Sequence, residues 1–357
     1  MTTGSERVDV VIIGPDHLDS FASNIADGFD DLGVRARVLD PSARFGSRSS
    51  NRFGTVIRRV VDQWDVARAN LVDRPVAEAL EELDPRLVLS IWGYFEPAQV
   101  ETWRRRTPRA DWALWYPDAF SNLGSHRTLL APYDHFFFKD PYIVDLFAQR
   151  VGLPAHYLPQ ACNPRLHRPQ GPSERGGQPS CDVVMVGNLY SYRLLILEAL
   201  AANVDLRIYG SQRAPLPARF SRLTRAHTGK AVFGADKARV FTEARIVLNT
   251  MHYGEVSGVN SRLFEATGSG GFVLTHANDR LHRYFEPGRE LAVFETPAEM
   301  NSTIAHYLRD PDARTAIASA GTARTHRDHT YSVRLVELIR ICGLQDESPF
   351  AALFDSR

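Results

Sequence analysis

The sequence predicts an α/β protein with two domains, each built on a mainly parallel sheet. The chain has 357 residues, a length that suits two domains of about 150 residues or slightly more. Short runs rich in β-branched residues alternate with longer amphipathic segments, which is the pattern of successive strand–helix units. A stretch rich in Pro, Gly and Ser, RPQGPSERGGQPS at 168–180, separates two such series and has the composition of a linker.

The first series begins with an apolar strand and an amphipathic helix. Phe21, Ile25, Phe29 and Leu32 recur at spacings of four, four and three, which predicts a helix over 18–32. The six strands predicted in this half are 8–13, 35–39, 87–91, 112–115, 135–138 and 156–158.

The second series has strands first and helices last. Its five predicted strands are 182–186, 205–209, 246–249, 272–275 and 291–294, followed by helices at 300–308, 312–320 and 332–342. Asp310-Pro-Asp312 matches an Asp-x-Asp metal pattern by letter. It lies between two helical segments, where Asp-Pro begins a helix, so we interpret it as a cap.

Composition excludes several classes of protein. There are 42 Lys+Arg and 42 Asp+Glu residues, so no net charge attracts nucleic acid or an anionic membrane. No apolar run approaches the ~20 residues that span a bilayer, and MTTGSERVDVVIIG lacks the features of a signal peptide, so we expect a cytoplasmic protein without stable membrane insertion. The three cysteines form no zinc pattern. Lys139, Lys230 and Lys237 are the three lysines, and we draw no functional conclusion from this arginine bias.

Four segments carry a family resemblance: VVMVGNLYSYRLLILEAL (183–200), LRIYG (206–210), ARIVLNTMHYGEVSGVNSRLFEATGSGGFVLT (244–275) and RDHTYSVRLVELI (327–339). They resemble the group 1 glycosyltransferases, in the spore-maturation-protein (CgeB)-like branch. The resemblance implies a GT-B fold, in which two Rossmann-like, doubly wound domains face each other across a cleft. It also implies transfer of a sugar from a nucleoside-diphosphate sugar to an acceptor hydroxyl, with no metal and no further cofactor.

The resemblance also assigns roles to the parts of the chain. Residues 1–167 are expected to be an acceptor-side domain, 168–180 the linker and 181–328 the nucleotide-sugar-binding domain. Residues 329–357, with the last helix, are expected to pack back on the first domain. The partners expected are a nucleotide-sugar donor and a small-molecule or glycan acceptor. The sequence leaves the donor base, the acceptor and the oligomeric state open.

The first candidate donor site follows the strand at 182–186. Gly187 allows a tight turn, and the N–H groups after Asn188 form an anion site at the start of a helix. Arg193, about one turn further on, can meet a diphosphate bidentately. The alternative is a plain strand–helix turn with a surface arginine.

The second candidate is the NSRLFEATG segment from Asn260. A helix starting there places Arg262 and the N–H groups around Ser261 near a diphosphate. By resemblance, Glu265, near the first turn, accepts the ribose hydroxyls. The alternative is an idle acid near a helix N-terminus.

Further donor contacts are expected at strand ends. The base and ribose are expected against Tyr209 and Asn249, although an aromatic residue that ends a strand is more often core. Many relatives have two glutamates separated by seven residues, whereas nine separate Glu255 from Glu265. Either Glu255 or Asn260 therefore stands near the transferred sugar.

In the first half, two loops after strands offer catalytic candidates. Histidine is a common general base, and Asp16 or Asp19 can orient His17 for that role on the acceptor hydroxyl. The alternative is that His17 caps the next helix. Asp118, after the strand at 112–115, can bind sugar hydroxyls.

Two other functions stay open on the same fold. One is a nucleotide-sugar epimerase, which needs water as the attacking group. The other is a catalytically silent nucleotide- or glycan-binding homologue, which the unusual glutamate spacing keeps open. A dehydrogenase is disfavoured because GPDHLDS, and not GxGxxG, follows the first strand.

Overall fold

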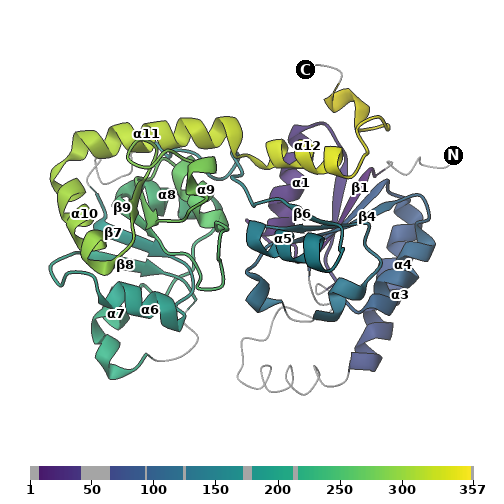
Figure 1. The fold of residues 1–357 in the computed structure, drawn as a ribbon, viewed down its shortest axis with the longest axis horizontal. Coiled ribbons are helices and arrows are strands. Elements are labelled where there is room, and N and C mark those ends of the chain that lie inside the picture. The colour runs from purple at the N-terminus through teal and green to yellow at the C-terminus, as the bar shows by residue number, and fades with distance from the viewer. Residues whose placement is uncertain are drawn as a thin grey trace. The chain divides into compact units, whose positions relative to one another are not determined.

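A computed structural model of the chain describes residues 8–41, 65–92, 95–123, 126–171, 179–211 and 216–354, without the side chains of residues 65–73 and 126. It divides into two compact units, which Figure 1 colours along the chain. Unit 1 holds the described residues up to Phe138, together with Ile143–Leu158 and those from Leu335 onwards. Unit 2 holds Lys139–Tyr142 and Pro159–Arg334. Residues 172–178 of the expected linker lie outside the described residues, and the expected domain limits stay a prediction.

Unit 1 contains a six-stranded sheet in the order β2-β1-β3-β4-β5-β6, with every neighbouring pair parallel. Its strands are β1 (Val10–Ile13), β2 (Ala36–Leu39), β3 (Leu87–Ser90), β4 (Asp111–Tyr116), β5 (His135–Phe138) and β6 (Ala155–Tyr157). Its helices are α1 (Phe21–Asp31), α3 (Asp65–Leu83), α4 (Pro97–Arg106) and α5 (Pro141–Arg150), with short 3-10 turns at Phe120–Asn122, His126–Leu130 and Ala351–Leu353.

The first helix shows how a polar side chain sets an element's start. Ser20 is the N-cap of α1, and its hydroxyl accepts a hydrogen bond from the Ser23 N–H at 3.0 Å. The predicted start at residue 18 is therefore wrong by three positions. Ile25 and Phe29 on its apolar face are fully buried, as the spacing predicts.

Unit 2 contains a five-stranded sheet in the order β11-β10-β9-β7-β8, again parallel throughout. Its strands are β7 (Cys181–Val186), β8 (Leu206–Tyr209), β9 (Ala244–Asn249), β10 (Val273–His276) and β11 (Ala292–Phe294). Its helices are α6 (Ser191–Glu198), α7 (Ser221–Ala226), α8 (Gly234–Glu243), α9 (Ser261–Gly268), α10 (Pro297–Arg309) and α11 (Pro311–Asp328), with 3-10 turns at Ala218–Phe220 and Leu281–Arg283. The prediction of two α/β series with parallel sheets is confirmed, and every predicted strand exists within two residues of its expected ends.

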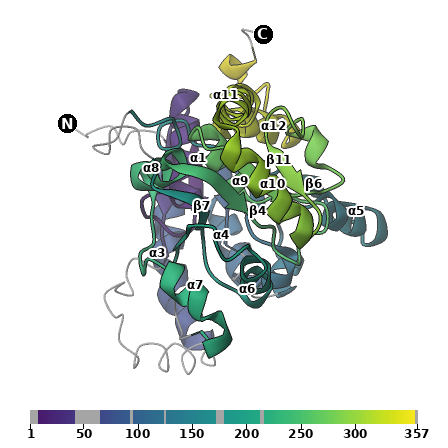
Figure 2. The same cartoon turned by 90° about the vertical axis from the view of Figure 1, so that its left-hand side faces the viewer.

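Helices cover both faces of the unit 2 sheet. Figure 1 shows α6 and α7 on one face and α8 and α9 on the other. One core joins alternate strand residues such as Met185 and Leu248 to Leu197 of α6 and Met300 of α10. Figure 2 shows α11 nearly end-on. The N-cap of α11 is Asp310, whose carboxylate accepts from the Ala313 N–H at 2.9 Å, so the cap predicted there is confirmed.

The last helix, α12 (Tyr331–Ile341), carries the division between the units, which falls after Arg334. Beyond it, Glu347 forms an ion pair with Arg86, which precedes β3 in unit 1. Among the described residues, no helix combines the length and the apolar character needed to cross a bilayer.

Candidate functional site

The centre of the unit 2 sheet is a topological switch point. β7 pairs with β8 on one side and with β9 on the other, so the chain leaves the carboxyl ends of β7 and β9 in opposite directions. Ligands of open parallel sheets bind at such a point, outside the carboxyl ends of the strands. The loops that follow β7 and β9 are therefore the first place to look for a site.

The loop after β7 turns on Gly187, which has a φ of +131°. Residues with a side chain rarely adopt this conformation. A Cβ on the neighbouring Gly210 would lie 2.4 Å from the Gly187 carbonyl oxygen, so this loop packs directly on the loop after β8. The Gly187 N–H donates to the Tyr209 carbonyl at 2.7 Å. Two glycines thus bring two backbone loops together at this edge.

Arg193 of α6 joins the loops after β7 and β9. Its side chain is buried, and its guanidinium donates to the Thr250 hydroxyl at 2.7 Å and to the Asn188 carbonyl at 2.5 Å. It also lies over the Tyr190 ring, 4.4 Å from the centroid. These partners hold the Arg193 guanidinium in place. They are uncharged, so they leave its positive charge unbalanced. Burial, and next the charge of Arg262, lower the pKa of Arg193 to about 10, so the group remains a cation at neutral pH.

Arg262 of α9 brings a second cation to the same place. A Cβ built on Gly187 would lie 2.6 Å from a terminal nitrogen of Arg262 and 3.0 Å from one of Arg193. Both guanidiniums therefore converge on the backbone of Gly187. Among the described residues, no carboxylate forms an ion pair with Arg262. Two adjacent cations over a bare glycine backbone make a site for an anion.

Asn260 and Ser261 start α9 beside these cations. Asn260 is the N-cap, and its side chain accepts from the Leu263 N–H at 3.1 Å and donates to the Thr250 carbonyl at 3.2 Å. The predicted helix start is therefore correct. Ser261 is the first helical residue. The positive end of this helix adds to the field of the two arginines.

Two buried polar atoms at the same edge have no hydrogen-bond partner among the described residues. One is Oδ1 of Asn249, at the end of β9, whose Nδ2 donates to Thr275 at 3.2 Å. The other is Nδ1 of His276, at the end of β10. Burial lowers the pKa of His276 to about 4, so its ring is neutral at pH 7. Native proteins satisfy nearly all buried polar atoms, so these two mark a place for a ligand or water.

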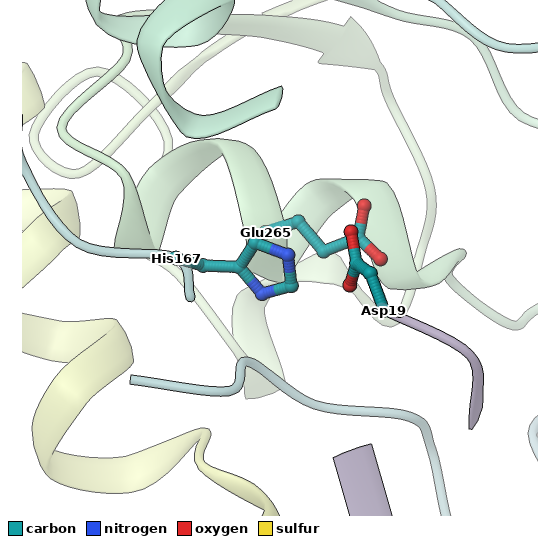
Figure 3. Close-up of side chains that lie close together, drawn as sticks. All are labelled: Asp19, His167 and Glu265. Carbon is teal, nitrogen blue, oxygen red and sulfur yellow. The ribbon is translucent and has the colours of Figure 1, made fainter. Parts of the chain in front are cut away.

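Glu265 is held by a lysine. It is the fifth residue of α9, close to the first turn as expected, and pairs with the Lys237 ammonium of α8 at 2.9 Å. The exposed fractions of the two side chains are 12% and 9%. A ring nitrogen of His167 lies within 4.8 Å of a Glu265 carboxylate oxygen. Figure 3 shows these two side chains close together. The Asn163 N–H donates to Nδ1 of His167 at 3.3 Å, which leaves the proton of a neutral ring on Nε2.

Glu255 also has a lysine partner. Its carboxylate pairs with the Lys139 ammonium at 2.5 Å and accepts from the His252 N–H at 2.9 Å. Both side chains of the pair are buried, with exposed fractions of 3% and 4%. The charge of Glu255 is therefore balanced by Lys139 within the protein, and its carboxylate fixes its own loop.

The candidate residues of unit 1 make hydrogen bonds mostly to residues near them in sequence. Asp118 is exposed, and its carboxylate accepts from the Ala119 N–H at 2.7 Å and from the Asn122 side chain at 3.1 Å, both within the turn that follows. Nδ1 of His17 lies 3.2 Å from the carbonyl of Leu18, while the N-cap of α1 is Ser20. The Asp16 N–H donates to Asp40 at 2.9 Å. Their catalytic roles stay predictions.

Sequence reasoning missed Lys139, Lys237 and His167. A signal for two of them was present, because the chain has three lysines among 42 basic residues. Two of the three are the buried partners of the two candidate glutamates. An ammonium is a compact point charge, so it can pair with one carboxylate oxygen in a small buried space.

Comparison with known proteins bears on the same region. Residues 193–340 match the family model described as glycosyl transferase-like, a segment that includes Arg193, Glu255, Arg262 and Glu265. No curated protein matches the chain in sequence.

Solved structures resemble the chain over nearly its whole length. A sucrose-phosphate synthase from Thermosynechococcus elongatus has a TM-score of 0.63 at 12% identity, covering 97% of this chain and 100% of that one. Anabaena HepE, in complex with UDP and glucose, has a TM-score of 0.61 at 14% identity, covering 94% and 100%. The DNA-modifying enzyme β-glucosyltransferase has a TM-score of 0.60 at 12% identity, covering 94% and 100%.

The chain has the GT-B fold. At these identities the likeness establishes the fold, and the predicted fold class is confirmed. The donor-site residues predicted from the resemblance, between Gly187 and Glu265, lie in unit 2. The two arginines and the two Lys–Glu pairs belong to the same unit.

Proposed function

We propose that this protein is a glycosyltransferase that takes a sugar from a nucleoside-diphosphate sugar and transfers it to an acceptor hydroxyl. The observation that carries the proposal is the pair of guanidiniums, Arg193 and Arg262, that converge on Gly187 at the switch point of the unit 2 sheet. The glycosyl transferase-like match over 193–340 supports it. So does the complex of HepE, a protein of the same fold, with UDP and glucose.

The charges suit a diphosphate. Arg262 lacks a carboxylate partner among the described residues. An incoming anion would therefore balance the positive charge of its guanidinium. Arg193 is already held by Thr250 and Asn188, which reduces the entropy lost when it meets a ligand. A fixed cation beside the leaving diphosphate also stabilises the charge that develops as the sugar departs.

Metal independence is part of the proposal. In many phosphate-handling enzymes a divalent cation neutralises the diphosphate. Here two guanidiniums and the N-terminus of α9 supply positive charge at one place. We therefore propose that donor binding needs no added metal.

Glu265 is the candidate for the ribose hydroxyls, since a carboxylate can accept both. Lys237 fixes its carboxylate, and His167 lies nearby. We further propose that the base and ribose lie against the strand ends at Tyr209 and Asn249. The spore-maturation-protein-like branch, a hexose as the transferred sugar and a cytoplasmic location stay predictions.

Thermal unfolding with UDP, GDP, ADP, CDP and TDP, each with EDTA and with Mg²⁺, tests the proposal. A ligand at a hundredfold excess over its dissociation constant stabilises the folded state by about 2.7 kcal/mol. We expect one diphosphate to raise the melting temperature equally in EDTA and in Mg²⁺. Release of that diphosphate from its sugar conjugate must then depend on an acceptor. Stabilisation by none of the five would contradict the proposal, and a shift that disappears in EDTA would contradict metal independence.

A further inference from the structure

The loop that follows β9, residues 251–258, is fastened at two points by one short segment. That segment is Lys139–Tyr142, which follows β5 in the chain and belongs to unit 2. The loop is rich in polar residues and glycine, and by composition alone it would be expected to move.

The first fastening is an ion pair. The Lys139 ammonium contacts the Glu255 carboxylate at 2.5 Å, and the second oxygen of Glu255 closes the loop on the His252 N–H at 2.9 Å. Both charged side chains are more than nine-tenths buried. In a place with little water, this attraction is weakly screened and fixes the middle of the loop.

The second fastening runs through Asp140. Its carboxylate accepts from the Val256 N–H at 2.7 Å and from the Ser257 N–H at 3.2 Å. The next residue, Gly258, packs against the same segment, since a Cβ there would lie 2.7 Å from the Lys139 carbonyl oxygen. Asn278 holds the end of the loop by donating to the Gly258 carbonyl at 2.9 Å.

The fastened loop presents an aromatic stack beside the two arginines. The Tyr190 ring, which lies against Arg193, is 4.8 Å from the ring of His252. The ring of Tyr253 in turn lies 4.2 Å from that of His252 at an interplanar angle of 33°. Tyr253 is 67% exposed, so its ring is accessible to a ligand.

We infer that Lys139 and Asp140 are positioning residues that hold the 251–258 loop so that Tyr253 contacts the sugar half of the donor. This inference rests on the proposed function. Sugar rings carry apolar C–H faces that pack on exposed aromatic rings, and the diphosphate site lies at the inner end of the same stack. Arg193 and Arg262 then bind the diphosphate, while the loop reads the sugar attached to it.

Two dissociation constants, one for the free diphosphate and one for the sugar nucleotide, distinguish diphosphate binding from sugar binding. The probes are the diphosphate that stabilises the wild type, among UDP, GDP, ADP, CDP and TDP, and its glucose conjugate. We expect Tyr253→Ala to weaken binding of the conjugate about tenfold and to leave the diphosphate within about twofold. Val151→Ala, at an exposed apolar residue of unit 1, should change neither constant. Equal affinity of wild type and Tyr253→Ala for the conjugate would overturn the inference while leaving the proposed function standing.

Lys139 is tested in the same assay. Lys139→Met should weaken the conjugate selectively, and Lys139→Arg, which keeps the charge, should restore most of the loss. The double variant Lys139→Met/Glu255→Gln removes both charges and serves where the single variant does not fold. A selective loss in the double variant supports positioning by the ion pair, and wild-type constants in it overturn that role.

Hydrogen exchange tests the fastening without any nucleotide. In the wild type, the amides of Val256 and Ser257 should be protected, and Asp140→Asn should speed their exchange at least about tenfold. Asp145→Asn, an exposed acid of α5, should leave both amides unchanged. Unprotected amides in the wild type would overturn the positioning role. If the wild type binds no nucleotide, the proposed function fails, and this exchange result still decides whether the loop is fastened.

Discussion

The carboxyl edges of the two sheets are built in different ways. In unit 2, polar side chains join residues far apart in sequence: Arg193 reaches Thr250 over 57 positions and Lys139 reaches Glu255 over 116. In unit 1, Asp118 bonds to residues one and four positions away. The unit 2 charges are also buried, whereas Asp118 is exposed.

The difference shows which sheet edge holds its polar side chains in fixed positions before a ligand binds. Burying a charge is unfavourable unless it is paired and hydrogen-bonded, so buried long-range pairs persist where their geometry has a use. In unit 2, the contacts of Arg193 with Thr250 and Asn188 are formed without a ligand, so the proposed anion site is largely in place beforehand. Of the unit 1 candidates, Asp118 satisfies a local turn, and Asp16 is joined through its N–H to Asp40 after β2.

The largest expected effect is on stability. Lys237→Met leaves Glu265 buried without its ammonium and should destabilise the protein by about 3–5 kcal/mol. Asp118→Ala in unit 1 removes hydrogen bonds at an exposed turn and should cost about 1 kcal/mol or less. Urea unfolding of both variants measures the contrast. Lys237→Met/Glu265→Gln should regain most of the loss, and a single variant within ~1 kcal/mol of wild type would break the comparison.

A pH dependence should come next in size. His329 is buried in unit 2, where its Nε2–H donates to the Tyr284 carbonyl at 2.8 Å and its Nδ1 accepts from Arg334 at 3.0 Å. Burial, and next the charge of Arg334, lower the pKa of His329 to about 4, so the folded protein keeps the ring neutral.

The unfolded ring binds its proton near pH 6.5, so it binds more protons than the folded one between pH 6.5 and 4. The contribution to stability is therefore complete above pH 6.5 and is lost towards pH 4, by up to about 3 kcal/mol. His329→Gln should flatten the dependence of unfolding free energy on pH in this window. His156→Gln, at a half-buried histidine of unit 1 whose pKa is also lowered by burial, should flatten it less. An unchanged slope in His329→Gln would contradict the assignment.

A pair of glycines gives a smaller and more specific contrast. Gly187→Ala forces a side chain into φ +131° and against Arg262, and should destabilise by roughly 1–3 kcal/mol while removing diphosphate binding. Gly152→Ala in unit 1 has φ +72° and open space around its Cβ, so it should cost about 1 kcal/mol and leave binding unchanged. Thermal unfolding with and without the diphosphate distinguishes the two. Normal ligand stabilisation of Gly187→Ala would show that the anion lies elsewhere.

Several strands were predictable because they are short runs of mostly buried apolar residues, as at β7 and β9. The end of α11 was not. The helix was expected to stop at residue 320 and continues to Asp328, because its buried face beyond Ile317 consists of Gly321 and Thr325. Small residues let the helix pack closely, and a Cβ on Gly321 would lie 2.3 Å from the Glu290 carbonyl. A hydrophobic period does not reveal such a face.

The site was predictable where its residues follow a strand or begin a helix, as Gly187 and Asn260 do. The Lys–Glu pairs were not, because tertiary folding alone brings Lys139 to Glu255 and Lys237 to Glu265. The spacing of the two glutamates differs from that of many relatives, which left open whether Glu255 lies near the transferred sugar. The structure gives a physical counterpart, since that carboxylate is committed to Lys139 and to its own loop. The roles assigned to individual residues stay predictions.

The central claim is that Arg262, with Arg193, binds the diphosphate of a donor at Gly187. Isothermal titration of the stabilising diphosphate into Arg262→Ala in EDTA tests it most directly. Arg309→Ala is the matched control, because α10 starts after the carboxyl end of β11 and Arg309 is exposed at its far end. A lost charge-assisted hydrogen bond should weaken binding at least about tenfold in Arg262→Ala and leave Arg309→Ala within about twofold. A folded Arg262→Ala protein that binds the diphosphate with wild-type affinity would contradict the account.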